Sequence, residues 1–376
     1  MATREHLFLL IIFVVFGLTF IVQSFYYVYF YLALMKKRPA GTPHKKEPVS
    51  VIICARNEEE NLRVFLPSVL KQDYPDFEVI VVNDCSEDNT FEVLGSLIPE
   101  YPHLKVSTVQ KDPKFTHNKK FAQFIGIKAA TNEYLLFTDA DCQPVSPDWI
   151  SGMASHFSEK NDFVLGYGGF FRGKGLLNRY IRYDCITIAM QYLGMAIRGL
   201  PYMGVGRNLA YKKSVFFRNK GFSSHNYVIS GDDDLFVNAN ASGRNTAVEY
   251  NHPSHTRSVP ASGFRQWFRQ KRRHLTTAKH YKPAHKILLM AEPSSRIIFY
   301  LTFAVLLSRL FLWQAVTAIF LLRMILQLAA LAIASRRLNE KGLIAISLIF
   351  DIFSPLLNGT VYLANIFNKS GQDKWK

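Results

Sequence analysis

The residues of this sequence whose types and spacing first suggest chemistry are two aspartates, Asp139 and Asp141. They end an apolar, β-prone run at residues 134–138 that is typical of a short buried strand. Such strands end at the ligand-binding edge of an open α/β sheet. Two carboxylates with one residue between them can converge on one point, and their hard oxygen atoms suit Mg²⁺ or Mn²⁺ held together with substrate phosphates. The pair therefore predicts a divalent metal site beside a diphosphate.

Acidic residues also follow two earlier predicted strands. Glu58 comes after Val49–Cys54, and Asp84 comes after Phe77–Val82. Carboxylates accept hydrogen bonds, so they suit the N–H groups of a base or the hydroxyl groups of a ribose. Lys119 lies just ahead of the metal strand, where its ammonium group can meet phosphate oxygens. These positions predict a nucleotide-binding edge.

A second acidic cluster consists of Asp232, Asp233 and Asp234. The apolar residues on both sides of it predict that the cluster begins a helix that packs on the core. Three adjacent like charges repel one another, so at least one carboxylate is expected to have a raised pKa, which suits a general base. Charge at a helix N-terminus is the structural alternative for part of the cluster.

A third cluster, residues 266–274, mixes aromatic side chains with arginine and contains Gln270 and Arg273. One interpretation is an amphipathic helix at a membrane interface, near residues 262–282. The other is a clamp on a pyrophosphate, because arginine makes planar bidentate contacts. Composition alone leaves both interpretations open.

The elements that must position these residues alternate between strand and helix from residue 49 to about residue 250. Strands about thirty residues apart, with helices between them, predict an α/β fold with a mostly parallel, Rossmann-like sheet covered on both faces. The turn after the first strand has no glycine, which disfavours both a dinucleotide-binding fingerprint and a phosphate-binding P-loop. The predicted strands are Val49–Cys54, Phe77–Val82, Leu104–Val109 and Tyr134–Thr138, and the helices begin near Glu58, Ser86 and Asn118.

Long apolar segments flank this region. No charged side chain occurs from Leu7 to Met35, which is long enough to cross a hydrocarbon core of about 30 Å. The predicted organisation is a transmembrane anchor at residues 5–35, a basic cytoplasmic linker at 36–48, a cytoplasmic domain at 49–285 and two to three transmembrane helices at 295–367. The apolar block from Ile297 to Ala334 is too long for one span and predicts a helical hairpin. The basic residues that follow the first span and this hairpin place the domain on the cytoplasmic face of the cell (inner) membrane.

The net charge of +16 is concentrated beside the apolar segments and in residues 265–286, which carry eight Lys and Arg and no acid. Such stretches next to membrane helices face anionic headgroups, and no nucleic-acid recognition motif accompanies them. The four cysteines have neither disulfide-scaffold nor zinc spacing, which fits small buried side chains in a reducing compartment.

In their order along the chain, these segments resemble glycosyltransferase family 2, the inverting enzymes with a GT-A type fold. The resemblance covers roughly residues 49–275 and is closest to the membrane-bound branch that contains polysaccharide synthases and ceramide glucosyltransferase-like enzymes. The matching segments are Val-Ser-Val-Ile-Ile-Cys-Ala-Arg-Asn-Glu58, Val-Val-Asn-Asp84, Asn118-Lys119, Thr138-Asp139-Ala-Asp141, Gly206-Arg-Asn208, Gly231-Asp232-Asp233-Asp234 and Gln270-Lys-Arg-Arg273-His274.

The sequence departs from the family pattern in three respects. The usual Glu-Asp pair is replaced by Gly231-Asp232 or by Asp232-Asp233, depending on the register. His274 stands where the family's Q-x-x-R-W motif has tryptophan, and a segment beginning at Gln266 offers a competing register. The predicted membrane part is also smaller than in most polysaccharide-secreting synthases of the family.

The resemblance implies an enzyme that moves a sugar from a nucleotide-diphosphate sugar, with UDP the expected nucleotide, to a lipid, lipid-linked or glycan acceptor at the membrane. Its implied setting is the biosynthesis of cell envelope polysaccharide. A processive polysaccharide synthase, an inactive membrane scaffold and a nucleotidyltransferase are the alternatives. The implied sites are a base at Asp232, with Asp233 as runner-up, a metal at Asp139 and Asp141, and substrate contacts at Glu58, Asp84, Lys119, Asp139, Gln270 and Arg273.

Overall fold

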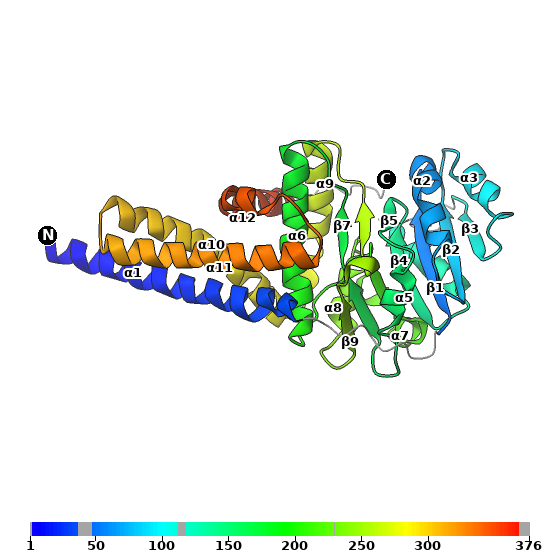
Figure 1. Cartoon of the computed structure of the whole chain (residues 1–376), viewed down its shortest axis with the longest axis horizontal. Helices are drawn as coiled ribbons and strands as arrows, with labels where there is room; N and C mark the ends of the chain where they lie inside the picture. Colours follow the sequence, from blue (N-terminus) through cyan, green and yellow to red (C-terminus); the bar gives the residue numbers. More distant parts are fainter. Residues whose placement is uncertain (1, 37–46, 112–117, 229, 368–376) are drawn as a thin grey trace.

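The computed structural model describes residues 2–36, 47–111, 118–228 and 230–367 of the chain. It consists of an α/β domain and a group of long apolar helices that project from one side of the domain (Figure 1). Most of the predicted basic linker, residues 37–46, lies outside the described residues.

A seven-stranded sheet forms the centre of the domain, in the order β3-β2-β1-β4-β8-β6-β9. The first four strands of this order are parallel, whereas β8 runs antiparallel to both of its neighbours. The predicted mostly parallel sheet is therefore confirmed. The strands are β1 (Val49–Ala55), β2 (Phe77–Asp84), β3 (Leu104–Val109), β4 (Tyr134–Asp139), β6 (Phe163–Gly166), β8 (Leu209–Lys212) and β9 (Thr246–Glu249).

Both faces of this sheet are buried, because neighbouring residues of each strand belong to different hydrophobic clusters. Ile52 of β1 packs into one cluster and Val51 into the other. On one face α4 approaches β1 so closely that a Cβ at Gly126 would lie 2.7 Å from the Ile52 side chain. The covering helices are α2 (Glu59–Leu70), α3 (Thr90–Leu97), α4 (Lys119–Ala129), α5 (Trp149–Ala154), α6 (Leu176–Ile197), α7 (Lys213–Arg218) and α8 (Asp234–Asn240).

A second sheet of three short strands lies between the main sheet and the apolar helices (Figure 1). Its strands are β5 (Cys142–Pro144), β7 (Gly168–Phe170) and β10 (Thr256–Ser258), with β10 in the middle. Helix α9 (Phe264–Leu275) follows β10, and short 3₁₀ turns occupy Ser223–His225, His252–Ser254 and Ala278–His280.

The helix after β2 begins later than the sequence predicts, at Thr90 rather than at Ser86. The intervening side chains bind the start of α2, and Asp88 also accepts a hydrogen bond from the N–H of Thr90, the first residue of α3, at 3.1 Å. Ser86 Oγ accepts a hydrogen bond from the Asn57 N–H at 2.9 Å, and Asp88 Oδ2 accepts one from the Glu59 N–H at 3.1 Å. These contacts join the loops that follow β1 and β2 into one rim.

Four helices among the described residues are long and apolar enough to cross a membrane. The first is α1 (Ala2–Phe25), which continues through a π turn at Tyr26–Phe30 and a 3₁₀ turn at Tyr31–Met35. The predicted hairpin is confirmed as α10 and α11, although α10 begins well before the expected Ile297. The remaining helices are α10 (Pro283–Ser308), α11 (Trp313–Arg337) and α12 (Ile344–Phe367).

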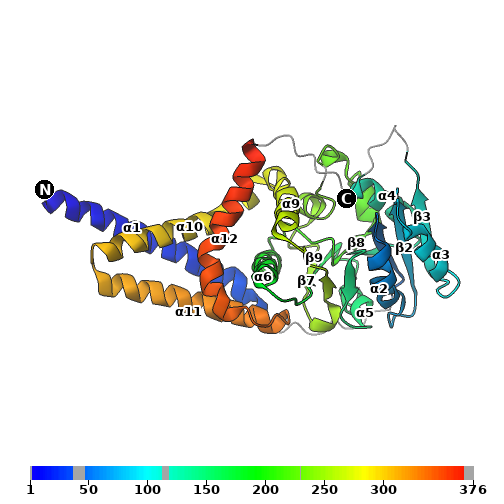
Figure 2. The same cartoon turned by 90° about the horizontal axis from the view of Figure 1, so that it is seen from above.

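The four apolar helices do not all run in the same direction. Helices α1, α10 and α11 extend side by side along the long axis of the molecule, whereas α12 runs across them (Figure 2). Asp351 of α12 is 2% exposed and bonds to Arg323 of α11 at 2.5 Å and to Arg296 of α10 at 3.0 Å. Arg323 in turn donates to Gln23 of α1. This buried ionic network fixes α12 to the other three helices.

Candidate active site

The predicted acidic edge exists at the C-terminal ends of β2, β1 and β4, which are adjacent in the sheet. Asp84 is the last residue of β2 and is fully buried, and Asp139 is the last residue of β4. Between them, Glu58 follows β1 at the N-cap position of α2 and accepts a hydrogen bond from Asn61 at 2.5 Å. The three carboxylates thus follow one another along a single edge, as the parallel pairing of the strands requires.

Asp139, Asp141 and Cys142 form a compact cluster in which one ligand atom from each residue lies within 4.8 Å of the others. Asp141 is held from the second sheet, because Ser258 Oγ of β10 donates to its Oδ2 at 3.0 Å. Burial, followed by the Asp141 charge, raises the pKa of the Cys142 thiol well above its usual range. The two carboxylates offer hard oxygen ligands, which suit Mg²⁺ or Mn²⁺.

Lys119 joins this cluster to the second acidic cluster. Its Nζ lies 2.7 Å from Asp139 Oδ1 and 3.2 Å from Asp232 Oδ2. Burial alone would lower the pKa of Lys119, but Asp139, Asp232 and Asp233 hold the pKa well above its usual range. Burial conversely raises the pKa of Asp139, and Lys119 more than offsets this effect, so the pKa falls below its ordinary value. The two acidic clusters therefore belong to one site.

The next residue, Lys120, has a different role. Its ammonium group is buried and donates to the carbonyl oxygens of His225 and Val228, both at 2.7 Å. Burial lowers the pKa of Lys120 to about 8. Because the two contacts fix the segment just before the aspartate cluster, Lys120 positions that cluster from behind.

The three aspartates of the second cluster have distinct surroundings. Asp233 accepts hydrogen bonds from the N–H groups of Asp234 at 2.7 Å and Gly206 at 2.6 Å. Asp234 accepts from Thr277 Oγ1 and from the Tyr281 hydroxyl at 2.6 Å. Among the described residues, the recorded side-chain partner of Asp232 is Lys119. Asp232 therefore shares the ammonium group of Lys119 with Asp139. Asp233 binds backbone N–H groups, and Asp234 binds hydroxyl groups of the segment 277–281.

The electrostatics of this cluster bear out the expected raised pKa. Burial, then the charges of Asp232 and Asp234, raises the pKa of Asp233 to about 7. Burial also raises the pKa of Asp234. Gly231, with φ of +97°, allows the sharp turn that starts the cluster, and a Cβ there would meet Leu235 at 2.5 Å.

Helix α9 carries Gln270 and Arg273 and packs against α6 rather than lying free. Its Trp267 ring meets Tyr180 of α6 edge-on at 5.4 Å, and Lys271 Nζ lies 2.6 Å from Asp184 Oδ2. The charge of Arg273 helps to lower the pKa of Asp139, so this guanidinium lies in the electrostatic field of the metal cluster. In contrast, the competing register begins at Gln266, which is exposed and accepts from the nearby Ser262.

Two residues of the site received no role from the sequence. Ser258, which holds Asp141, lies far along the chain in a three-residue strand and has no pattern of its own. Arg207 stacks on Phe170 at 4.2 Å, and its carbonyl oxygen accepts a hydrogen bond from Thr138 Oγ1, next to Asp139, at 3.1 Å. Arg207 does belong to the segment Gly206-Arg207-Asn208, which is one of the segments that resemble the family. That resemblance could have indicated a role for Arg207.

Residues 50–218 of the chain match the family described as Glycosyl transferase family 2. A probable glycosyltransferase of Bacillus subtilis, YdaM, is 26% identical over 266 residues, which cover 65% of this chain and 58% of that protein. The poly-β-1,6-N-acetyl-D-glucosamine synthase of Staphylococcus epidermidis is 32% identical over 128 residues, which cover 32% and 29%. The chain thus spans less than two thirds of the length of these relatives.

Among solved structures, the fold is similar to that of the mannosyltransferase PcManGT from Pyrobaculum calidifontis, solved with GDP-Man and Mn²⁺. The TM-score is 0.63 at 18% identity, and the match covers 96% of this chain and 99% of that one. The similarity extends over the α/β domain and the apolar helices together.

Proposed function

We propose that the chain, which is a glycosyltransferase of family 2 with a GT-A type fold, transfers a sugar from a nucleotide-diphosphate sugar to an acceptor at a membrane surface, with inversion. The observation that carries this proposal is the pair of contacts made by Lys119, which joins Asp139 at the sheet edge to Asp232 in the second acidic cluster. One compact site thereby contains metal-binding, phosphate-binding and proton-accepting groups.

In this proposal the nucleotide lies along the rim formed by the loops after β1 and β2. Glu58 and Asp84 accept hydrogen bonds from its ribose and base, and a UDP-sugar is the expected donor. Asp139 and Asp141 would hold a divalent cation, which when bound neutralises charge on the leaving diphosphate. Lys119 and Arg273 supply further positive charge to the diphosphate, and Gln270 lies one helical turn before Arg273 on α9.

Asp232 acts as the base. It takes the proton from an acceptor hydroxyl while that oxygen forms a bond to the anomeric carbon from the face opposite the diphosphate. The bond between the anomeric carbon and the diphosphate oxygen breaks, and the electron pair leaves with the diphosphate. The metal-side carboxylate and the base both contact the Lys119 ammonium group, so the groups proposed to meet the leaving group and the nucleophile lie within reach of one reacting carbon.

The acceptor is proposed to be a lipid, a lipid-linked sugar or a short glycan, on the cytoplasmic side of the cell membrane. The four apolar helices keep the site close to a bilayer, which favours a membrane-bound acceptor. The similarity to a poly-β-1,6-N-acetyl-D-glucosamine synthase keeps processive synthesis as the second candidate. Sizing the product distinguishes the two, because a single transfer gives one product and processive synthesis gives a long ladder.

The test is transfer by the purified full-length chain from radiolabelled UDP- and GDP-sugars into membrane lipid extract, with Mg²⁺ or Mn²⁺. Asp232→Asn should lower kcat by about 10²–10⁴, the usual contribution of a general base. Asp141→Ala should abolish the response to added metal. Lys160→Ala, an exposed change outside the site, is the matched control. Activity that persists unchanged in both site variants would overturn the assignment.

A further inference from the structure

A basic pocket with no role in the proposed transfer opens where the connection between α11 and α12 meets the start of α6. Its volume is about 430 Å³, within the usual range for ligand pockets. It is lined by the glycines at 173, 175 and 342 and by five cationic side chains, Arg172, Lys174, Arg179, Arg182 and Lys341. No acidic side chain belongs to this lining.

One of the five cations is already neutralised and forms the fixed floor of the pocket. Arg182 is 4% exposed and donates from Nε and Nη2 to Glu340 Oε2, at 2.9 and 2.5 Å, and from Nη2 to the Lys341 carbonyl at 2.9 Å. Glu340 also binds Arg257, which immediately precedes Ser258 in β10. These bonds lock the α11–α12 connection onto α6 and the second sheet.

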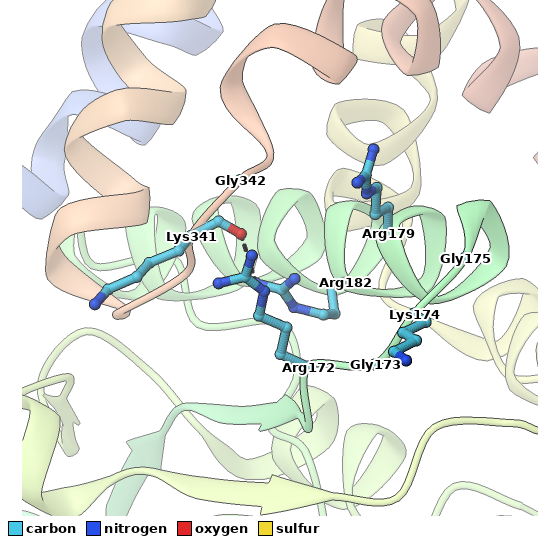
Figure 3. A pocket seen from close by; sticks show the side chains of 8 residues that line it. All are labelled: Arg172, Gly173, Lys174, Gly175, Arg179, Arg182, Lys341 and Gly342. Atoms are coloured by element: carbon cyan, nitrogen blue, oxygen red, sulfur yellow. Dashed lines mark hydrogen bonds between the residues drawn. The ribbon is translucent and has the colours of Figure 1, made fainter.

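The other four cations are available to a ligand. No carboxylate in the described part of the chain pairs with Arg172, Lys174, Arg179 or Lys341, and all four are exposed. Figure 3 shows Arg172 and Arg182 beside the Lys341–Gly342 main chain, with Arg179 rising from the first turn of α6. Exposed cations that line one cavity create a positive potential, which favours a bound anion.

The backbone adds to this preference for an anion. Helix α6 is 22 residues long and begins at the pocket, where Gly175 occupies the N-cap position with φ of +90° and no side-chain cap. The N–H groups of its first turn, together with the helix dipole, favour negative charge at this end. The glycine therefore allows both the turn and a close approach to the helix start.

The position of the pocket points to a membrane lipid as the source of the anion. Lys341 and Gly342 lie between the end of α11 and the start of α12, two of the helices suited to a bilayer. Exposed apolar side chains follow the lining residues along the chain: Leu176, next to Gly175, is 63% exposed, and Ile344, two residues after Gly342, is 42% exposed. Basic pockets at the cytoplasmic ends of membrane helices bind phosphate-bearing headgroups. We propose that this pocket binds the phosphate group of a membrane lipid, with the lipid tails against these apolar side chains.

The test uses the full-length chain in neutral detergent without nucleotide sugar, so its result does not depend on transferase activity. Three probes are titrated: a short-chain phosphatidylglycerol, a short-chain diacylglycerol without phosphate, and inorganic phosphate. Bound lipid is counted by native mass spectrometry, and binding is measured as a shift in Tm. Phosphatidylglycerol should bind more tightly than either of the other probes.

The decisive variant is Arg172→Ala with Arg179→Ala, which should weaken the apparent Kd for phosphatidylglycerol about thirtyfold at low salt. Lys160→Ala with Arg244→Ala removes the same charge at exposed positions elsewhere and should leave the Kd unchanged. Arg172→Lys with Arg179→Lys should retain most of the binding, which separates lost charge from misfolding.

Three outcomes would overturn the proposal. The first is equal binding of phosphatidylglycerol by the wild type and the double alanine variant. The second is binding of diacylglycerol as tight as that of phosphatidylglycerol, which would mean that the phosphate is not recognised. The third is variant-sensitive binding of inorganic phosphate as tight as that of the lipid, which would assign the pocket to a soluble anion.

Discussion

The three neighbouring aspartates of the second acidic cluster make different contacts in this site. Asp233 is committed to two backbone N–H groups and Asp234 to two hydroxyl groups, whereas Asp232 shares the ammonium group of Lys119 with Asp139. The sequence leaves open whether Asp232 or Asp233 is the base, and the contacts of the two carboxylates distinguish them. These contacts favour Asp232 as the proposed base, because a carboxylate bound to two backbone N–H groups is a structural acceptor.

The raised pKa of Asp233 predicts a pH-dependent contribution to stability. In the folded state its carboxyl group keeps a proton up to about pH 7, whereas the unfolded chain releases it near pH 4. Between these values the folded state binds more protons, so a rise in pH lowers the free energy of unfolding. The Tm of Asp233→Asn relative to wild type should therefore rise by a few degrees from pH 5 to pH 8. An offset that stays constant across this range would contradict the assignment.

Lys119→Met should lower kcat/KM by about 10², of the order seen when one fixed electrostatic group is removed from an active site. Without the shared ammonium group, Asp139 and Asp232 face each other as like charges, so the fall should be steeper at low pH. Lys119→Arg keeps the charge and should be less affected. Initial rates from pH 6 to 9 measure both effects, and a methionine variant within threefold of wild type would remove Lys119 from the mechanism.

Much of this site is predictable from sequence because strand-end carboxylates of parallel neighbours must meet at one edge. Glu58, Asp84 and Asp139 follow that rule. Ser258 does not, since its contact with Asp141 arises from a three-residue strand in the second sheet. Serine also has no spacing or periodicity that marks it as a partner, so only the tertiary structure reveals it.

At the scale of elements, the first four strands were predicted to within two residues because each is an apolar run bounded by turn residues. The short strands β6, β8 and β9 were not predicted, since four residues are too few to establish a period. The basic segment predicted as an interfacial helix or a clamp is the helix α9, held on α6 by Trp267 and Lys271. These contacts show how α9 packs on the protein, and both interpretations of its basic residues stay predictions.

One buried charge, Asp351, contributes to the packing of α12 on α10 and α11. Asp351→Ala would leave Arg323 without its carboxylate and Arg296 with only Glu292. Removing one partner of a buried pair costs about 3–5 kcal/mol, which corresponds to a fall in Tm of about 10 °C for a domain of this size. Thermal unfolding in detergent measures the change. Ile352→Ala, at the next and more exposed position, should have a much smaller effect, and equal losses in the two variants would refute the role of the network.

For the whole molecule, the distribution of basic residues predicts the orientation in the membrane. Arg309 lies with Glu5 at the far end of the long helices, whereas Arg336, Arg337 and Lys341 lie at the end nearest the α/β domain. Cys85 is the one cysteine of the four that is not buried, so it is first replaced by serine. In this Cys85→Ser background, Leu310→Cys should react with a membrane-impermeant maleimide on intact cells. Arg244→Cys, in the α/β domain, should react only after the cells are permeabilised. Labelling of the second variant on intact cells would reverse the proposed orientation.

The ionic network around Arg323 also has a consequence for biosynthesis. Arg323 binds Gln23 from the first helix and Asp351 from the last, so the helices that enclose it are separated by the entire α/β domain. While the ribosome makes the chain, the arginine emerges before the aspartate that neutralises it. The group of four apolar helices is therefore complete only after the α/β domain has been synthesised, and α12 is the last helix to join it. A ribosome stalled before Asp351 should leave Arg323 without its carboxylate partner, although Phe16 of the first helix can already stack on Phe299 of α10.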